Sequence, residues 1–239
     1  MREILSIMRR AIIDFKMIES GDKIAVGLSG GKDSLTLLKA LALYKKFSPE
    51  KFELCAITVD PTGGKADYSL IKKFCEELEV EYIIAPSDIF EVIFDIRKEK
   101  SPCSLCAKLR RGALNETAVR SGCNKVALGH TADDLIETFF LSMFYEGRLS
   151  TFAPVTYLDR KNVTVIRPFI YLWEKYTKKA ANDLPVYHNT CPVNHHTQRE
   201  NVKNKLKELQ KEMPLAKERV LSAIINPDRY NLFKPTNTD

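Results

Sequence analysis

Apolar residues follow two patterns along this chain: short apolar runs typical of buried strands, and apolar positions spaced three or four residues apart, typical of helices. In residues 3–18, Ile4, Met8, Ile12 and Phe15 recur every three or four positions, which predicts an amphipathic helix. Short apolar runs then alternate with segments of helical period. The expected strands are residues 24–28, 52–59, 81–85, 125–128 and 163–166, and the expected helices lie around residues 35–46, 70–78, 105–113, 135–143 and 173–181. From about Pro185 the pattern changes to a loop and two basic helices.

This alternation predicts an α/β fold, a doubly wound parallel sheet with helices on both faces. We expect three parts: an N-terminal helix (1–20), a central α/β domain (21–184), and a C-terminal loop with basic helices (185–239). Ligands of such sheets bind at the carboxyl ends of the strands. Asp60, Gly129 and His130 each come directly after an expected strand. One crevice at the carboxyl ends of the strands could therefore hold all three, together with the glycine-rich loop at residues 28–34.

A glycine-rich turn joins the first strand to its helix in the stretch K-I-A-V-G-L-S-G-G-K-D-S (23–34). Glycines let the backbone approach an anion closely, and a helix start offers unpaired N–H groups and partial positive charge. Gly27 and Gly31 are one residue too close for a Walker A loop, and the glycine order fails the dinucleotide fingerprint. We therefore expect another kind of phosphate loop. Its members are Leu28, Ser29, Gly30, Gly31, Lys32, Asp33 and Ser34.

Composition narrows the class of protein. The 239 residues can form one sizeable core with a small appendage, and 44% hydrophobic and 28% charged residues are globular values. No apolar run reaches the ~18 residues of a membrane helix. Arg9, Arg10 and Asp14 interrupt the apolar positions that a signal peptide would need. We therefore expect a cytoplasmic protein without membrane contact, in which six cysteines favour metal binding or chemistry over disulfides.

Cys103 and Cys106 form a C-x-x-C at an expected loop–helix junction. A thioredoxin-type redox pair would need a context that is absent here. A zinc site would need two more ligands, which Cys191, His195 and His196 could supply. An iron–sulfur cluster and two buried core cysteines are the other readings. The C-x-x-C alone does not decide among them.

Longer motifs add a family resemblance. The loop S-G-G-K-D-S resembles the signature of the PP-loop ATP pyrophosphatases. The stretch S-P-C-S-L-C-A-K-L-R-R-G-A-L (101–114) is similar to the cysteine motif of the tRNA 2-thiocytidine synthetase family within them. The similarity continues through A-L-G-H-T-A-D-D-L-I-E-T (127–138), M-F-Y-E-G-R-L (143–149), R-P-F-I-Y (167–171), E-K (174–175), and Cys191 with Gln198 and Arg199.

The resemblance implies a PP-loop ATPase fold (adenine nucleotide alpha-hydrolase-like) and ATP-dependent thiolation of a tRNA base, most simply at a cytosine. It also implies a 4Fe–4S cluster held by Cys103, Cys106 and Cys191, with Cys55, Cys75 and Cys123 structural. Two departures bear on the substrate. Thr131 stands where the family usually has a second histidine, and Asn194 stands where it often has another cysteine.

Catalytic roles are expected for Asp33, Asp133, Asp134 and Arg110. The three aspartates are candidate ligands of the Mg²⁺ that accompanies ATP, although acids at a helix start are also favoured by the helix dipole. Other residues have expected binding roles. ATP is expected to contact the phosphate loop and also Asp60, Gly129 and His130. The phosphates of tRNA are expected to contact basic side chains, namely Arg110, Arg111, Arg199, Lys203, Lys205 and Lys207.

The lysines could instead form an ordinary solvated helix surface. The sulfur would come from a donor such as a cysteine desulfurase or free sulfide, and the chain could form a homodimer. Two alternative functions stay open. One is a PP-loop ligase or amidase with a structural zinc at the cysteines. The other is a tRNA- or cluster-binding protein without turnover.

Overall fold

The computed structural model describes residues 1–96, 102–187 and 198–229. It forms two compact units: residues 1–131 with 153–194, and residues 132–152 with 195–239. Each unit is described by itself. The division expected from the sequence, at residues 20/21 and 184/185, stays a prediction.

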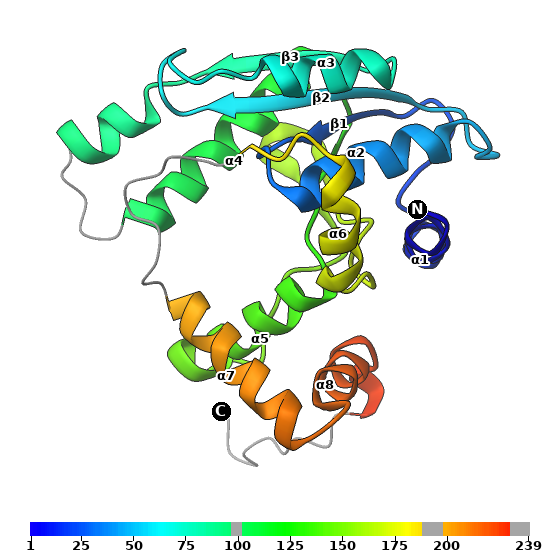
Figure 1. The fold of residues 1–239 in the computed structure, drawn as a ribbon, viewed down its shortest axis with the longest axis vertical. Coiled ribbons are helices and arrows are strands. Elements are labelled where there is room, and N and C mark those ends of the chain that lie inside the picture. Colours follow the sequence, from blue (N-terminus) through cyan, green and yellow to red (C-terminus); the bar gives the residue numbers. More distant parts are fainter. Residues whose placement is uncertain (97–101, 188–197, 230–239) are drawn as a thin grey trace, which may run out of the picture. The chain divides into compact units, whose positions relative to one another are not determined.

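The first unit is built on a six-stranded sheet (Figure 1). Its strands are β1 (Lys23–Gly27), β2 (Glu53–Asp60), β3 (Glu81–Pro86), β4 (Lys125–Ala127), β5 (Val155–Leu158) and β6 (Val163–Ile166). The order is β3-β2-β1-β4-β6-β5, and every pair is parallel except β5 with β6. The expected doubly wound sheet is therefore confirmed, and the wholly parallel sheet is wrong at one edge.

The strand order reverses between β1 and β4. From β1 the chain winds outward through β2 to β3, and from β4 the sheet continues on the other side through β6. A switch point of this kind leaves a crevice at the carboxyl ends of the two strands, because the loops that follow them diverge to opposite faces of the sheet. The loop at 28–31 and the turn at Gly129 leave the sheet at this point.

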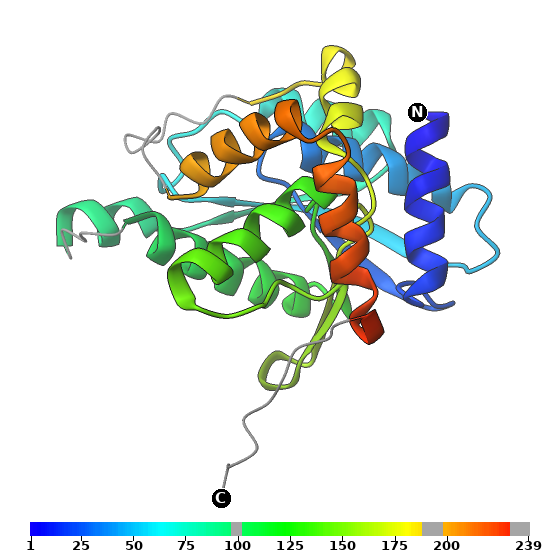
Figure 2. The same ribbon diagram turned by 90° about the horizontal axis from the view of Figure 1, so that it is seen from below.

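Helices flank the sheet and follow the expected order. In the first unit they are α1 (Arg2–Asp14), α2 (Lys32–Lys45), α3 (Ser69–Glu77), the π-helix η1 (Glu91–Ile96), α4 (Pro102–Arg120), η2 (Asp159–Lys161), α6 (Glu174–Ala180) and η3 (Ala181–Asp183). Helices α2 and α4 lie on opposite faces of the sheet (Figure 2). On the α4 face, Ala25, Cys55 and Val126 pack with Leu114 and Ala118 of the helix.

The second unit consists of α5 (Ala132–Glu146), α7 (Gln198–Glu212), α8 (Ala216–Ile225) and the short turn η4 (Pro227–Arg229). Val202 and Leu206 of α7 are buried, as are Leu135 and Ile136 of α5. Val202 and Leu206, one helical turn apart, thus mark the packing face of α7. Among the helices of the described ranges, none is long and apolar enough to cross a lipid bilayer.

Candidate functional site

The loop between β1 and α2 is closed by its own serines. Ser34 Oγ accepts a hydrogen bond from Ser29 N–H (3.2 Å) and donates to the Gly31 carbonyl (2.9 Å). Gly31 N–H donates to Ser29 Oγ (3.3 Å). Gly30 has φ +79°, a left-handed conformation that favours glycine. The loop therefore holds the first turn of α2, with its unpaired N–H groups, in an arrangement suited to phosphate.

A network of charges joins this first turn to α6. Lys32 Nζ lies 2.8 Å from Asp33 Oδ2 and 2.9 Å from Glu174 Oε1, and the Thr177 hydroxyl donates to Asp33 Oδ1. Lys178 Nζ pairs with the other Glu174 oxygen at 2.9 Å. Burial lowers the pKa of Lys32, but the two carboxylates outweigh it and hold that pKa above its ordinary value. Asp33 and Lys32 are thus oriented from outside the loop.

The end of β4 touches the same turn. A Cβ atom on Gly129 would come within 3.0 Å of the Asp33 carbonyl group and 3.1 Å of Ser34 N. Only glycine allows this approach without a shift of backbone. His130 follows immediately and is half-buried. The structure therefore brings Gly129 beside the phosphate loop, with His130 as the next residue, and the expected contact of both with ATP stays a prediction.

An apolar pocket of about 140 Å³ opens next to the loop. Its walls come from the ends of β1, β2 and β4 and from one face of α4. The lining residues are Gly27, Leu28, Ser29, Ile57, Val59, Arg110, Arg111, Leu114 and Leu128. Arg110 stacks its guanidinium over the Phe90 ring at 5.8 Å from the centroid. The pocket suits a flat base, with the phosphate loop on one side and two arginines on another.

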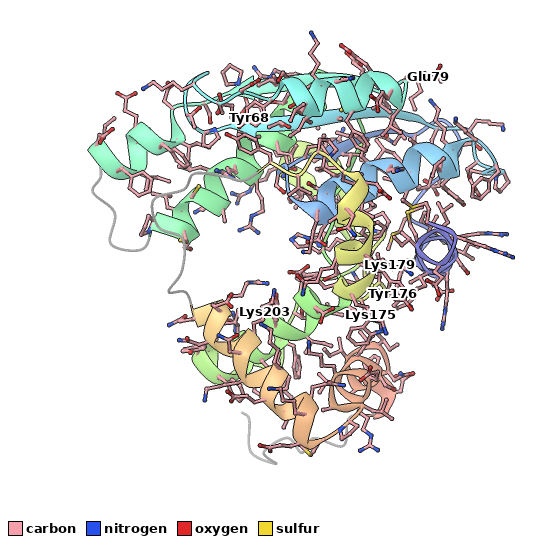
Figure 3. All side chains as sticks on the ribbon, viewed as in Figure 1. Tyr68, Glu79, Lys175, Tyr176, Lys179 and Lys203 are labelled. Carbon is pink, nitrogen blue, oxygen red and sulfur yellow. The ribbon has the colours of Figure 1, made fainter. Side chains whose placement is uncertain are left out.

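Asp60 anchors the loop after β2. Its carboxylate is buried and accepts hydrogen bonds from Thr62 N–H (3.0 Å), Thr62 Oγ1 (2.7 Å), Gly64 N–H (2.7 Å) and the Tyr68 hydroxyl (3.3 Å). Tyr68, labelled in Figure 3, directly precedes α3. Burial raises the pKa of Asp60, but these donors outweigh it, so that pKa lies below its ordinary value. The structure thus gives Asp60 a role in shaping the loop. Its expected contact with adenosine stays a prediction.

The two motif cysteines lie in the first two turns of α4. Cys103 is exposed and Cys106 half-buried, and a spacing of three residues puts them on one side of the helix. Cys191, the third expected ligand, lies outside the described residues. Within the described part of the chain, no three Cys, His, Asp or Glu side chains gather as a metal site. Cys55, Cys75 and Cys123 are buried, as expected for structural residues.

In the second unit, the acidic start of α5 is paired with basic side chains of the C-terminal helices. Asp133 Oδ1 lies 2.9 Å from Lys217 Nζ, and Asp134 Oδ1 lies 3.5 Å from Arg199 Nη1. Arg199 Nη1 also lies 3.4 Å from Glu137 Oε2, and its Nη2 donates to the hydroxyl of a neighbouring threonine on α5 (3.0 Å). These contacts give Arg199 a structural partner that the sequence did not indicate.

Glu137 is 5% exposed at the centre of this group. Burial raises its pKa to about 7, and the charges of Asp134 and Asp133 add to the rise, while Lys203 and Arg199 oppose it. Lys203 of α7, labelled in Figure 3, is half-buried by its accessible surface. Lys205 and Lys207 are exposed and keep the solvent-facing position expected for phosphate contacts.

Several side chains at the first unit's site were not assigned a role from the sequence. Glu174 and Arg167 occur in the motifs E-K and R-P-F-I-Y, which were noted without a function. Thr177 and Phe90 carried no local signal. Tyr187 N–H donates to the Gly30 carbonyl at 2.9 Å, and the centre of its ring lies 5.3 Å from that of Tyr68, just before α3.

Comparison with known proteins agrees with this geometry. A family model for the PP-loop domain matches residues 4–215. The chain is 41% identical over 220 residues to a tRNA-cytidine(32) 2-sulfurtransferase of Aliivibrio fischeri, covering 90% of this chain and 72% of the relative. It is 39% identical over 239 residues to that of Geobacter metallireducens, covering 97% and 92%.

Among solved structures, the U34-tRNA thiolase NcsA of Methanococcus maripaludis with its [4Fe–4S] cluster superposes with a TM-score of 0.77 at 26% identity, over 96% of this chain and 79% of that one. An NH₃-dependent NAD synthetase of Campylobacter jejuni shares the fold alone, with a TM-score of 0.51 at 16% identity over 100% and 98% of the two chains. The loop, the cysteine pair and these similarities together place the chain in the PP-loop family, among the tRNA-cytidine(32) 2-sulfurtransferases.

Proposed function

We propose that this protein is an ATP-dependent tRNA sulfurtransferase that replaces O2 of a cytosine with sulfur, forming 2-thiocytidine. The observation that carries the proposal is the phosphate loop at the switch point of the sheet, with an apolar base-sized pocket beside it. The relatives are named for cytidine 32 of tRNA, and we propose the same target here.

ATP would lie with its phosphates on the loop from Leu28 to Ser34 and its base in the neighbouring pocket. The N–H groups at the start of α2 and the hydroxyls of the loop are donors for phosphate oxygens. Mg²⁺ needs carboxylate or phosphate oxygens. Asp33 could supply one only after Lys32 releases it. Asp133 and Asp134 stay candidates that would likewise have to leave their basic partners.

The proposed reaction has two steps, activation of the base and replacement of its oxygen by sulfur. The O2 oxygen of cytosine attacks the α-phosphorus of ATP, and pyrophosphate leaves with the bridging oxygen. Sulfur then bonds to C2, the C2–O2 bond breaks, and AMP leaves with that oxygen. The loop, Lys32 and Arg110 can stabilise the negative charge on the phosphates in the transition state.

The cysteines of α4 fit an iron–sulfur cluster. An exposed and a half-buried thiol lie three residues apart near the start of one helix, on the same side of it, as two ligands of one cluster require. We propose Cys103, Cys106 and Cys191 as the ligands. When bound, a cluster with three protein ligands would supply an open iron that can carry the sulfide. The [4Fe–4S] cluster of the NcsA thiolase supports the proposal of a cluster in this chain.

The other partners follow from the chemistry. We propose that tRNA phosphates contact Arg110, Arg111, Lys205 and Lys207, that the sulfur comes from a cysteine desulfurase or free sulfide, and that the protein works in the cytoplasm. A homodimer is compatible with this function. Arg199 and Lys203 stay predicted tRNA contacts, although Arg199 already has partners on α5.

The experiment is an anaerobic assay with tRNA, ATP, Mg²⁺ and sulfide, followed by mass spectrometry of the nucleosides. We expect 2-thiocytidine, AMP and pyrophosphate in equal amounts, and none of them from an Asp33→Ala variant. Release of ADP and orthophosphate would refute attack at the α-phosphate. Adenylate formation on a small molecule without tRNA would favour the ligase alternative, and tRNA binding without turnover would favour the non-catalytic one.

A further inference from the structure

Lys32 of the phosphate loop is shared between two carboxylates. Its Nζ lies 2.8 Å from Asp33 Oδ2 and 2.9 Å from Glu174 Oε1. The Glu174 side chain is 15% exposed, against 30% for Asp33 and 24% for Lys32. An ion pair that is partly withdrawn from water is stronger than one at the surface, where solvent screens the charges. The contact of Lys32 with Glu174 is therefore the better shielded of the two.

Helix α6 positions the groups on both sides of Lys32. Glu174 is the first residue of this helix, and its second oxygen, Oε2, lies 2.9 Å from Lys178 Nζ, one turn further on. Thr177 is fully buried, lies three residues after Glu174, and donates its hydroxyl to Asp33 Oδ1. Residues three and four apart face the same side of a helix. One side of α6 therefore orients both carboxylates that contact Lys32.

Asp33 cannot keep its contact with Lys32 and also bind a metal ion through the same oxygen. The divalent cation that accompanies ATP takes its protein ligands from carboxylate oxygens, and Asp33 Oδ2 faces the ammonium group of Lys32. Loss of this contact alone would leave the partly buried ammonium without a counter-charge, which is costly. Glu174 removes this cost, because it already holds Lys32.

We infer that Glu174 is a positioning residue, which keeps Lys32 in place when Asp33 exchanges this lysine for the Mg²⁺ of MgATP. The inference rests on the proposed function, in which the phosphates of ATP lie on the loop, and it gives the motif E-K (174–175) a role. Glu174 needs no contact with the nucleotide or the metal ion for this role. It acts through Lys32, so its effect should disappear when Lys32 is replaced.

Calorimetric binding of α,β-methylene-ATP tests this without turnover, because this analogue cannot be cleaved between its α- and β-phosphates. The quantity compared is the Mg²⁺ enhancement, the affinity for the analogue at saturating Mg²⁺ divided by the affinity in EDTA. Glu174→Gln removes the carboxylate that takes over Lys32. We expect the Mg²⁺ enhancement to fall about tenfold, the loss typical of one hydrogen bond to a charged group.

The affinity in EDTA gives a readout that a merely structural defect would not produce. Glu174→Gln removes a negative charge next to the phosphate loop, so the affinity without Mg²⁺ should stay the same or rise. A general distortion of the loop would instead lower the affinity with and without Mg²⁺ alike, and that result would overturn the inference.

Two further variants control for charge and for the helix. Glu174→Asp keeps the charge on a shorter side chain and should recover part of the Mg²⁺ enhancement. Lys179→Gln changes an exposed side chain of the same helix (Figure 3) and should match the wild type.

A double-mutant cycle decides whether Glu174 acts through Lys32. Lys32→Gln frees Asp33, so its Mg²⁺ enhancement should be at least that of the wild type. Adding Glu174→Gln to this variant should then change nothing. If Glu174→Gln lowers the Mg²⁺ enhancement by the same factor in both backgrounds, Glu174 acts on the metal ion directly and the inference is overturned.

A wild-type Mg²⁺ enhancement in Glu174→Gln would also overturn the exchange. So would a reduced one in Lys32→Gln alone, a measurement that does not depend on the fold of the Glu174 variants. Wild-type protein that binds the analogue and forms 2-thiocytidine leaves the proposed function intact in each of these cases. Wild-type protein that binds no nucleotide overturns both.

Discussion

The pairing of α5 with α7 predicts a pH-dependent stability that depends on one carboxyl group. Glu137 is nearly fully buried, and its pKa is raised from 4.5 to about 7, first by burial and then by Asp134 and Asp133, against the opposing charges of Lys203 and Arg199. Glu137→Gln replaces it with a neutral side chain of the same shape. The variant therefore resembles the protonated form at every pH.

The sign follows from proton binding. Between pH 4.5 and 7 the folded state keeps the proton on Glu137 and the unfolded state releases it, so the free energy of unfolding falls as the pH rises. The contribution is fully present below pH 4.5 and is lost by about pH 7. The difference between the pKa of Glu137 in the folded and in the unfolded state corresponds to about 3 kcal/mol of unfolding free energy, at about 1.4 kcal/mol for each pKa unit.

Urea denaturation followed by circular dichroism, at intervals between pH 5 and 8, measures the effect. The free energy of unfolding of Glu137→Gln minus that of the wild type should rise with pH and level off above pH 7. Glu146→Gln is the control on the same helix. The pKa of Glu146 is lowered by its hydrogen bond from Arg148, so this carboxyl titrates below the measured range and the difference for Glu146→Gln should stay nearly flat between pH 5 and 8. If the difference in unfolding free energy between Glu137→Gln and the wild type does not change with pH, the raised pKa of Glu137 is refuted.

Three further predictions concern the proposed reaction. Ser34→Ala should lower tRNA-dependent pyrophosphate release at least tenfold, since it removes the hydroxyl that closes the phosphate loop, and a phosphate-release assay with pyrophosphatase checks this. Cys106→Ala should lose the iron and sulfide of the anaerobically reconstituted protein, whereas Cys75→Ala, buried in the core, should keep them in the same metal analysis. Exchange of Lys205 and Lys207 for Glu should weaken tRNA binding and flatten its salt dependence without changing cluster content, and unchanged affinity would make this surface a merely solvated one.

Local signals in the sequence were enough for most of the first unit. The two hydrophobic periods gave the order of strands and helices, because burial on one face repeats every two residues in a strand and every 3.6 in a helix. The loop could be recognised because its glycines and serines act within a few residues of one another. Gly30 at φ +79° and the contacts between Ser29 and Ser34 are of this local kind.

Other features escaped local reasoning. The edge strand β5 (Val155–Leu158) has only four residues, and exposed Tyr157 hides its alternation, so it reads as a loop until it pairs with β6. The turn between them depends on Asn162 at φ 49°, a conformation that asparagine tolerates. Helix α1 ends at Asp14, earlier than its pattern suggested, and Lys16 at φ 47° lies just beyond it.

The partners of charged side chains were decided by the tertiary structure alone. A lysine or an aspartate looks the same in a sequence whether it faces water, a ligand or an opposite charge. Only the packing of α6 beside the phosphate loop gives Lys32 its second carboxylate, Glu174. Only the packing of α7 on α5 turns Arg199 from a free cation into the partner of Glu137. Periodicity and backbone conformation are properties of neighbouring residues, whereas an ion pair joins residues that the chain brings together only after it has folded.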